Sequence, residues 1–354
     1  MQVGASRNAA LSTRSCVALL SWSNHTLTAA NNVPEIDIDA FGVDLGVGAP
    51  VAAFQIKTSA TSCCVEYQLY SLTKPPHVLR SITGADAFSA ADIDLDGRVE
   101  IWTTDAAAVD GFEGLRLAEL DFAPPVVLRF SAHKLLDVSA EFQAEFDGRI
   151  ASVQKELTPG DLRAFKATDG KLASSDLSSA EYIHKLRTVK AKILEIFWCY
   201  LYSGREQQAW RSLGEMWPAG DVARIRAAIL SARTHGIISQ LDGISAGRST
   251  KTIRHAVLFN AVSSPSGQKL ELTPPESILL NRPPLIDGSG NSSSDAVLDL
   301  VIDSAGKVRS AKPSGRVAVD AGLIRASLGW KFIPAFKNGR AVACRTRLSV
   351  SPKQ

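Results

Sequence analysis

The hydrophobic residues of this chain change their spacing twice, and this limits what the chain can fold into. Between residues 31 and 130 they alternate with polar residues in short runs, a pattern typical of strands. Between residues 137 and 243 they recur at the spacing of amphipathic helices. Alternation returns from residue 296 onward. The sequence therefore predicts an α+β protein with more than one domain, which a length of 354 residues allows.

We divide the sequence into five parts on this basis. Residues 31–136 form an antiparallel β region, residues 137–245 a helical segment and residues 246–295 a connector rich in proline and serine. Residues 296–354 form a small α+β domain. Residues 1–30 combine arginines, a short apolar run and small residues, so they are a secretory signal peptide or a disordered start. No later run approaches the roughly 20 apolar residues that span a bilayer.

The β region contains five short strand-like runs separated by glycine, proline and aspartate. These runs are 51–56, 65–70, 78–82, 99–102 and 126–130. Cys63 and Cys64 adjoin the second run, where strand alternation directs neighbours to opposite faces. We therefore predict that they are small hydrophobic residues and not a bonded pair. The five cysteines of the chain follow no metal-binding or redox spacing.

The sharpest local motif lies inside the β region, where Asp92, Asp94 and Asp96 are followed by Gly97 and then by Glu100. Carboxylates at alternate positions before a glycine can surround a hard cation, because glycine permits the turn that directs them inward. The loop is not an EF-hand, since its twelfth position is threonine and a predicted strand follows it. The sequence predicts a calcium site formed by Asp92, Asp94, Asp96 and Glu100. The alternative is a solvated acidic turn.

Residues 84–104 resemble the calcium-binding repeat of FG-GAP or integrin-type β-propellers, in which three alternating aspartates and a glycine precede a fourth aspartate. Glu100 departs from that pattern. Asp37, Asp39 and Asp44 are candidates for a decayed earlier copy. A closed propeller needs at least about four blades, and residues 31–136 hold two at most. The resemblance implies calcium binding by a partial propeller-like fragment or a small sandwich.

The helical segment is predicted to contain helices at 142–157, 178–202, 205–213 and 222–233, and a capped restart at Thr158. Its aromatic residues are predicted to be core and not a peptide-binding groove. Four basic residues lie opposite the apolar stripe of the second helix, so we expect them to be solvated. They are Lys185, Arg187, Lys190 and Lys192.

The last part of the chain has the order strand, strand, helix, strand, strand. These elements are predicted at 296–303, 307–311, 319–328, 330–335 and 341–350. Asp320 is the expected helix N-cap, and Asn338-Gly339 is a strong signal for a tight turn. Four apolar side chains are predicted to share a core: Leu323, Leu328, Trp330 and Phe332.

Residues 268–354 resemble the C-terminal domain of TonB-family proteins. The matching residues are Gly306, Ser314-Gly315, Asp320, Trp330, Phe332, Pro334-Ala335 and Asn338-Gly339, preceded by Arg282-Pro283-Pro284. The resemblance implies a sheet whose last strand accepts a strand from a partner protein. It also implies a periplasmic or cell-envelope setting and a link to TonB-type transport, although the membrane helix of a true TonB is not seen. The predicted contact residues are Arg340, Val342, Cys344, Arg345 and Arg347.

The net charge of +3 hides an asymmetry between the two ends of the chain. Residues 31–137 hold 16 acidic and 7 basic residues, whereas residues 268–354 hold 7 acidic and 13 basic ones. The basic residues form no run or stripe. The split therefore indicates different surfaces and not a nucleic-acid binder.

The sequence shows no catalytic constellation. Its six histidines are scattered, no glycine-rich phosphate loop follows a strand, and the Gly-x-Ser-x-Gly motif is absent. We therefore predict a non-enzymatic cell-envelope protein that binds another protein through its C-terminal domain. The alternative is a calcium-dependent β-domain binding protein, or an undetected hydrolase, in which that domain is an accessory.

Overall fold

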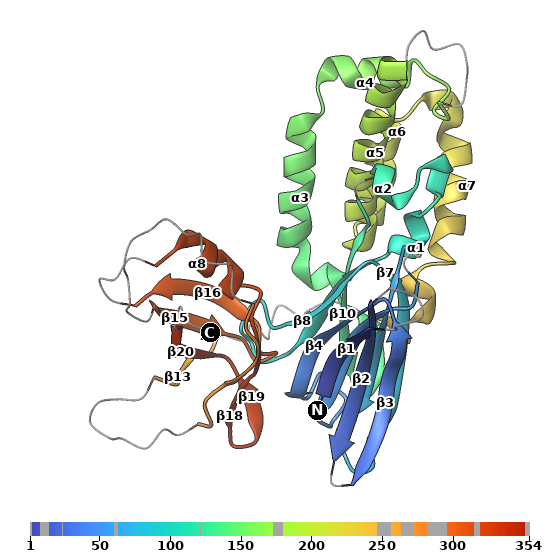
Figure 1. Cartoon of the computed structure of the whole chain (residues 1–354). Coiled ribbons are helices and arrows are strands. Elements are labelled where there is room, and N and C mark those ends of the chain that lie inside the picture. The colour runs from blue at the N-terminus through green and yellow to red at the C-terminus, as the bar shows by residue number, and fades with distance from the viewer. Residues whose placement is uncertain are drawn as a thin grey trace.

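The computed structural model of the chain is a mixed α and β structure in which most neighbouring strands are antiparallel (Figure 1). It describes residues 2–7, 14–22, 24–59, 63–120, 122–172, 180–245, 256–262, 272–281, 296–314 and 319–350. Figure 1 shows the N-terminal sheets below the long helices and the C-terminal domain beside the sheets. Among the described residues, none of the helices has the length and apolar character needed to cross a bilayer.

Three successive sheets come first, and in each of them consecutive strands pair as antiparallel neighbours. Their orders are β1-β2-β3, β4-β5-β6-β7 and β8-β9-β10-β11, and β12 joins the third sheet in parallel with β11. The strands are β1 Gln2–Arg7, β2 Arg14–Trp22, β3 His25–Val33, β4 Glu35–Val43, β5 Val51–Lys57, β6 Val65–Ser71, β7 His77–Ala85, β8 Phe88–Ala91, β9 Glu100–Thr104, β10 Pro125–Ser131, β11 Lys134–Asp137 and β12 Gly243–Ile244.

The second sheet lies in the middle of this stack because both of its faces are apolar. Ala52 and Phe54 of β5 pack toward the first sheet, whereas Val51 and Ala53 join the core shared with the third sheet and the helices. A strand that is buried on both faces has a nearly continuous apolar run, as β5 does. The middle sheet therefore links two cores.

Residues 1–30 were expected to be a signal peptide or a disordered start. Their described part instead forms β1, β2 and most of β3. Ala18 and Leu20 of β2 and Ala29 and Ala30 of β3 are buried against the second sheet. Burial of these apolar side chains stabilises the strands. The signal-peptide alternative stays a prediction.

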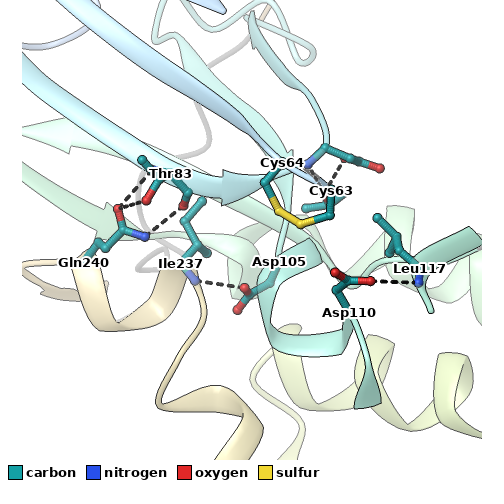
Figure 2. The surroundings of a disulfide bond; sticks show 10 residues. Cys63, Cys64, Thr83, Asp105, Asp110, Leu117, Ile237 and Gln240 are labelled. Carbon is teal, nitrogen blue, oxygen red and sulfur yellow. Dashed lines mark hydrogen bonds between the residues drawn. A yellow bond between two sulfur atoms is a disulfide. The ribbon is translucent and has the colours of Figure 1, made fainter. Parts of the chain in front are cut away.

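Cys63 and Cys64 form a disulfide, so the prediction that they are unbonded is wrong. Their sulfur atoms are 2.01 Å apart. Strand β6 begins only at Val65, so the two cysteines lie in the preceding loop, where strand alternation does not separate them. Figure 2 shows the disulfide beside the segment that carries Asp110 and Leu117.

The helical segment covers the open face of the third sheet and shares its core. Phe146 and Ile150 of α3 (Gln143–Glu156) pack in the same buried cluster as Val126 and Leu128 of β10.

The predicted helix restart at Thr158 is confirmed, since Thr158 Oγ1 accepts a hydrogen bond from the Asp161 amide at 3.1 Å. The helices are α1 Ala106–Val109, α2 Leu117–Leu120, α3 Gln143–Glu156, α4 Pro159–Lys166, α5 Ala180–Tyr202, α6 Glu206–Met216 and α7 Val222–Arg233, and the 3₁₀ turns are Phe112–Gly114, Ser139–Phe142, Ala219–Asp221 and Ile237–Gln240. Residues 178 and 179 of the predicted second helix lie outside the described residues.

Lys190 on α5 corrects the expectation of a solvated basic face. It is 1% exposed, and its Nζ lies 3.2 Å from Glu113 Oε2. Burial lowers the pKa of Lys190. A charged amine is stable in this position because Glu113 and the Lys171 carbonyl both accept hydrogen bonds from it.

The C-terminal domain has its own core, built on a sheet with the order β13-β20-β15-β16. Two pairs of short strands, β14 with β17 and β18 with β19, complete the domain. The elements are β13 Phe259–Asn260, β14 Glu276–Leu279, β15 Ala296–Ile302, β16 Val308–Pro313, α8 Ala321–Ser327, β17 Lys331–Ile333, β18 Ala335–Lys337, β19 Arg340–Val342 and β20 Cys344–Val350. The described parts of the predicted connector thus supply β13 and β14. Arg282-Pro283-Pro284 and Gly315, part of the TonB resemblance, lie outside the described residues.

Three of the four predicted core residues of this domain pack together. Trp330 and Phe332 are buried and Leu323 is partly buried against them, whereas Leu328 is 49% exposed. Helix α8 ends at Ser327, so Leu328 lies beyond its last turn and does not follow the helical stripe. The Asp320 cap is confirmed, since its side chain accepts hydrogen bonds from the Gly322 and Leu323 amides.

Two lysines of the C-terminal domain attach it to the second sheet. Lys307 Nζ lies 2.5 Å from Asp39 Oδ1, and Lys331 Nζ lies 2.5 Å from Asp37 Oδ2. The Tyr67 hydroxyl donates to the other oxygen of Asp39 at 2.6 Å. The acidic and basic ends of the chain therefore meet at an interface.

Candidate metal centre

The acidic loop joins the first two strands of the third sheet. Asp92 follows β8 directly, and Glu100 is the first residue of β9. Gly97 has a left-handed backbone with φ of 82°, which turns the loop back on itself. Oxygens of Asp92, Asp94 and Asp96 all lie within 4.8 Å of one another. The structure thus brings the three predicted aspartates together.

Asp92 is the most tightly held residue of the loop. Its side chain is fully buried. Oδ1 accepts a hydrogen bond from the Asp96 amide at 2.9 Å, and Oδ2 accepts one from the Gly97 amide at 3.0 Å. Burial raises the pKa of Asp92, and the carboxylates of Asp96 and Asp94 add to this increase. A cation between these carboxylates would stabilise their charged forms.

Asp94 and Asp96 are half-buried beside Asp92. Asp96 accepts hydrogen bonds from the Arg98 amide at 2.9 Å and from its guanidinium at 2.8 Å. The four carboxylates of the loop therefore face two guanidinium groups, those of Arg98 and Arg129. Arg129 also pairs with Glu141, at 2.9 Å, so the carboxylates around the loop outnumber the guanidinium groups and a cation would be favoured there.

Glu100 has one buried carboxylate oxygen without a hydrogen-bond partner among the described residues. Its side chain is fully buried, and Oε1 accepts a hydrogen bond from Arg129 Nη2 at 2.6 Å. Oε2 is also buried and has no hydrogen-bond partner among the described residues. Burial raises the pKa of Glu100 to about 8, although Arg129 opposes this effect, and Asp94 and Asp96 raise it further. An oxygen in this position needs a proton or a cation.

The donor set fits calcium better than the softer metals. All four candidate side chains offer oxygen, and Ca²⁺ takes six to eight oxygen ligands at about 2.3–2.6 Å, which waters and loop carbonyls can complete. Zinc favours histidine nitrogen and cysteine sulfur, which none of these four side chains supplies. The residues present therefore fit a hard cation.

A second loop occupies the same position in the second sheet. It joins β4 to β5, and Asp44 Oδ1 accepts hydrogen bonds from the amides of Gly46, Val47 and Gly48 at 2.8–3.0 Å. Asp44 and Asp92 thus both accept hydrogen bonds from backbone amides of their own loop. Asp37 and Asp39, proposed with it as a decayed copy, lie instead on strand β4 and bind the docking lysines.

Two residues near the acidic loop, Asp303 and Ser304, could not be recognised from the sequence. The Ser304 hydroxyl donates to Asp92 Oδ2 at 2.7 Å, and the Asp92 amide donates to Asp303 Oδ2 at 3.1 Å. These partners are separated by more than 200 positions, and no local pattern reports such a contact. A turn of the C-terminal domain is therefore part of the surroundings of the site.

The five predicted partner-binding residues differ in their exposure. Arg340, Arg345 and Arg347 are exposed, Val342 is half-buried, and Cys344 is fully buried in the C-terminal core. Arg347 pairs with Asp299 of the same domain at 2.9 Å. The arginines therefore remain available at the surface, whereas the Cys344 side chain faces inward.

The edge of β20 is already occupied at its beginning. Strand β13 pairs with it in parallel at Cys344 and Arg345, and the amides of Phe259 and Ala261 donate to the carbonyls of Ala343 and Arg345. Among the described residues, no strand pairs with this edge from Thr346 onward. Strand addition there is thus limited to the last part of β20.

No protein-family model, no curated protein and no solved structure matches this chain. The likeness to FG-GAP repeats and to TonB C-terminal domains therefore rests on the sequence motifs alone. The function has to be argued from the geometry of the two sites.

Proposed function

We propose that the protein is a non-enzymatic binding protein that holds a calcium ion in the loop from Asp92 to Glu100. Two observations carry this proposal. The oxygens of Asp92, Asp94 and Asp96 lie within 4.8 Å of one another, a group that does not include Glu100. At the end of the same loop, Oε2 of Glu100 is buried and has no hydrogen-bond partner among the described residues. The two sheets that follow residue 34 each contain a meander of four consecutive strands, which favours the propeller-like interpretation of this region.

Titration calorimetry of the full chain with CaCl₂ tests the metal site. The full chain is needed because the β region and the helices share one core. We expect one site, which Asp94→Ala abolishes. Asp44→Asn is the matched control, since Asp44 caps a separate loop that joins β4 to β5, and it should leave calcium binding unchanged. Absence of heat at millimolar calcium would indicate that the loop is a solvated turn.

A second candidate function is the binding of a cell-envelope protein through the C-terminal sheet, with a link to TonB-type transport. The observation in its favour is the edge of β20 beyond Arg345, with which no strand of the described residues pairs. Because backbone groups alternate along a strand, Arg347 and Ser349 direct their amides to the same edge as Ala343 and Arg345. A partner strand would pair there, and the nearby arginines would favour an acidic partner segment.

The second candidate is tested with a pair of variants at Ser349, which is exposed. Ser349→Pro removes one edge-facing amide, whereas Ser349→Ala retains it. Both full-length variants must melt like the native chain. In a pull-down from an envelope extract, the proline variant should lose partners that the native chain and the alanine variant retain. Equal capture by all three proteins would contradict strand addition at this edge.

A further inference from the structure

The acidic loop contacts the C-terminal domain at Asp92 and Leu95. Three hydrogen bonds join them: Ser304 Oγ to Asp92 Oδ2 at 2.7 Å, the Asp92 amide to Asp303 Oδ2 at 3.1 Å, and the Val257 amide to the Leu95 carbonyl at 3.1 Å. Asp92, Asp303 and Ser304 are all fully buried or nearly so. The two contacts of Asp92 are thus buried, whereas Val257 is 53% exposed.

The hydrogen bonds of Asp92 determine which of its oxygens can reach a cation. Each carboxylate oxygen has about two positions for hydrogen bonds or ligands. Oδ2 uses both positions, since it accepts from the Gly97 amide and from the Ser304 hydroxyl. Oδ1 accepts a hydrogen bond from the Asp96 amide. Ser304 therefore fixes the carboxylate so that Oδ1 keeps one position open for a metal.

The turn that carries Ser304 is held firmly. Asp303 Oδ1 accepts hydrogen bonds from the amides of Ala305 and Lys307, both at 2.9 Å. Gly306 has φ of +84°, and a Cβ added there would lie only 1.8 Å from the Phe332 carbonyl oxygen. Ala305 packs into the main core. When the C-terminal domain docks, this rigid turn thus places the Ser304 hydroxyl beside Asp92 Oδ2.

We infer that Ser304 is a positioning residue of the calcium site, so that calcium binding and docking of the C-terminal domain strengthen each other. This inference rests on the proposed calcium function. By linkage, a contact that improves calcium affinity by a given factor is itself stabilised by the same factor when calcium binds. The C-terminal domain is then a part of the metal site and not only a neighbour.

Calorimetry with CaCl₂ on the full-length Ser304→Ala variant tests the first half of this coupling. Loss of the hydroxyl frees the Asp92 carboxylate to rotate, so we expect calcium affinity to fall about tenfold, which is about 1.4 kcal/mol at 25 °C. Ser327→Ala is the matched control. Ser327 is also a buried serine of this domain, but its hydroxyl donates to the Ile324 carbonyl within α8. This control should leave calcium affinity unchanged even if it lowers stability.

Hydrogen exchange tests the second half. Calcium should slow exchange of the Asp92 and Val257 amides, which cross the interface, in the native chain and the Ser327→Ala variant, and by a smaller factor in Ser304→Ala. If the native chain binds no calcium, both the metal site and the coupling are wrong. If Ser304→Ala binds calcium as tightly as the native chain, or calcium leaves these two amides unaffected, the coupling alone is wrong and the metal site stands.

Discussion

Trp330 is the residue on which the C-terminal core most depends. Its side chain is fully buried, and its indole N–H donates to the Asn281 carbonyl at 2.7 Å. Trp330→Ala should lower the free energy of unfolding by about 3–5 kcal/mol, because it leaves a cavity that the sheet cannot fill. Leu328→Ala is the control, since Leu328 is 49% exposed and its loss should cost under about 1 kcal/mol. Urea unfolding followed by circular dichroism measures both, and equal midpoints would contradict the core assignment.

Asp105 makes stability depend on pH. It is fully buried and accepts hydrogen bonds from the Tyr202 hydroxyl at 2.6 Å and the Ile237 amide at 2.8 Å. Burial raises its pKa above the unfolded value. The folded state therefore keeps a proton that the unfolded state has released, and this group's contribution to stability falls as pH rises between the two pKa values.

The variant Asp105→Asn cannot ionise and should lose this contribution to the pH dependence. Its stability relative to the native chain should therefore rise from acidic to neutral pH, as measured by urea unfolding at both. Tyr202→Phe is the companion variant, because it removes a hydrogen bond that favours the charged carboxylate. A difference between Asp105→Asn and the native chain that is constant with pH would show that Asp105 titrates as it does in the unfolded chain.

Residues whose role depends on distant partners are those that sequence reasoning missed. Helical spacing places Lys190 in solvent because it describes only one helix, whereas the partner Glu113 comes from a separate loop. Ser304 and Asp303 were missed for the same reason. By contrast, Asp92, Asp94 and Asp96 are close in sequence, and their grouping could be predicted from spacing alone.

At the scale of elements, the strands and helices that were predicted were found, whereas the nine-residue strands β2, β3 and β4 and the short strand β14 were not predicted. Helix α7 lies at the predicted residues 222–233, and the five predicted strands of the β region each overlap one of β5, β6, β7, β9 and β10. Strands β13 and β14 have two and four residues, which is too short for a period, and they come from a segment rich in proline and serine. Their pairing depends on tertiary contacts with β20 and β17.

Substitutions at two glycines test the effect of backbone conformation on stability without an effect of packing, because both glycines have open surroundings. Gly339 ends the Asn338-Gly339 turn with φ of +75°, whereas Gly214 lies inside helix α6, and no atom lies within 4 Å of an added Cβ at either position. Gly339→Ala should destabilise the protein by about 1 kcal/mol, since alanine disfavours the left-handed region. Gly214→Ala should stabilise it by about 0.5–1 kcal/mol through helix propensity. Thermal unfolding measures both, and shifts of the same sign would contradict this explanation.

For the whole molecule, the charge asymmetry of the sequence has a structural role. The acidic β region and the basic C-terminal domain meet where Lys307 binds Asp39 and Lys331 binds Asp37. Asp39 is nearly fully buried, and Lys307 and Lys331 are 13% and 15% exposed at their side chains. The Lys307–Asp39 pair is therefore screened less by salt than surface pairs are, whereas Asp37 of the second pair is 42% exposed. The sequence predicted the two charged surfaces, but not that they face each other.

We expect the double variant Lys307→Ala and Lys331→Ala to loosen the C-terminal domain from the sheets. Removing the lysines leaves the buried Asp39 without its cation, which typically costs about 3–5 kcal/mol. The C-terminal domain, which has its own core, should then melt separately, so that calorimetry shows two transitions in the variant.

Arg347→Ala is the matched control for this experiment. Arg347 also forms an ion pair, but with Asp299 of its own domain on an exposed surface. Its loss should leave the melting profile of the native chain unchanged, because such exposed pairs contribute little. If the double variant melts as the native chain does, the lysines do not hold the domains together. The hydrogen bonds that Ser304 and Val257 donate and the one that Asp303 accepts would then have to hold the domains together. Ser304→Ala in the variant that lacks both lysines would be expected to separate the two transitions.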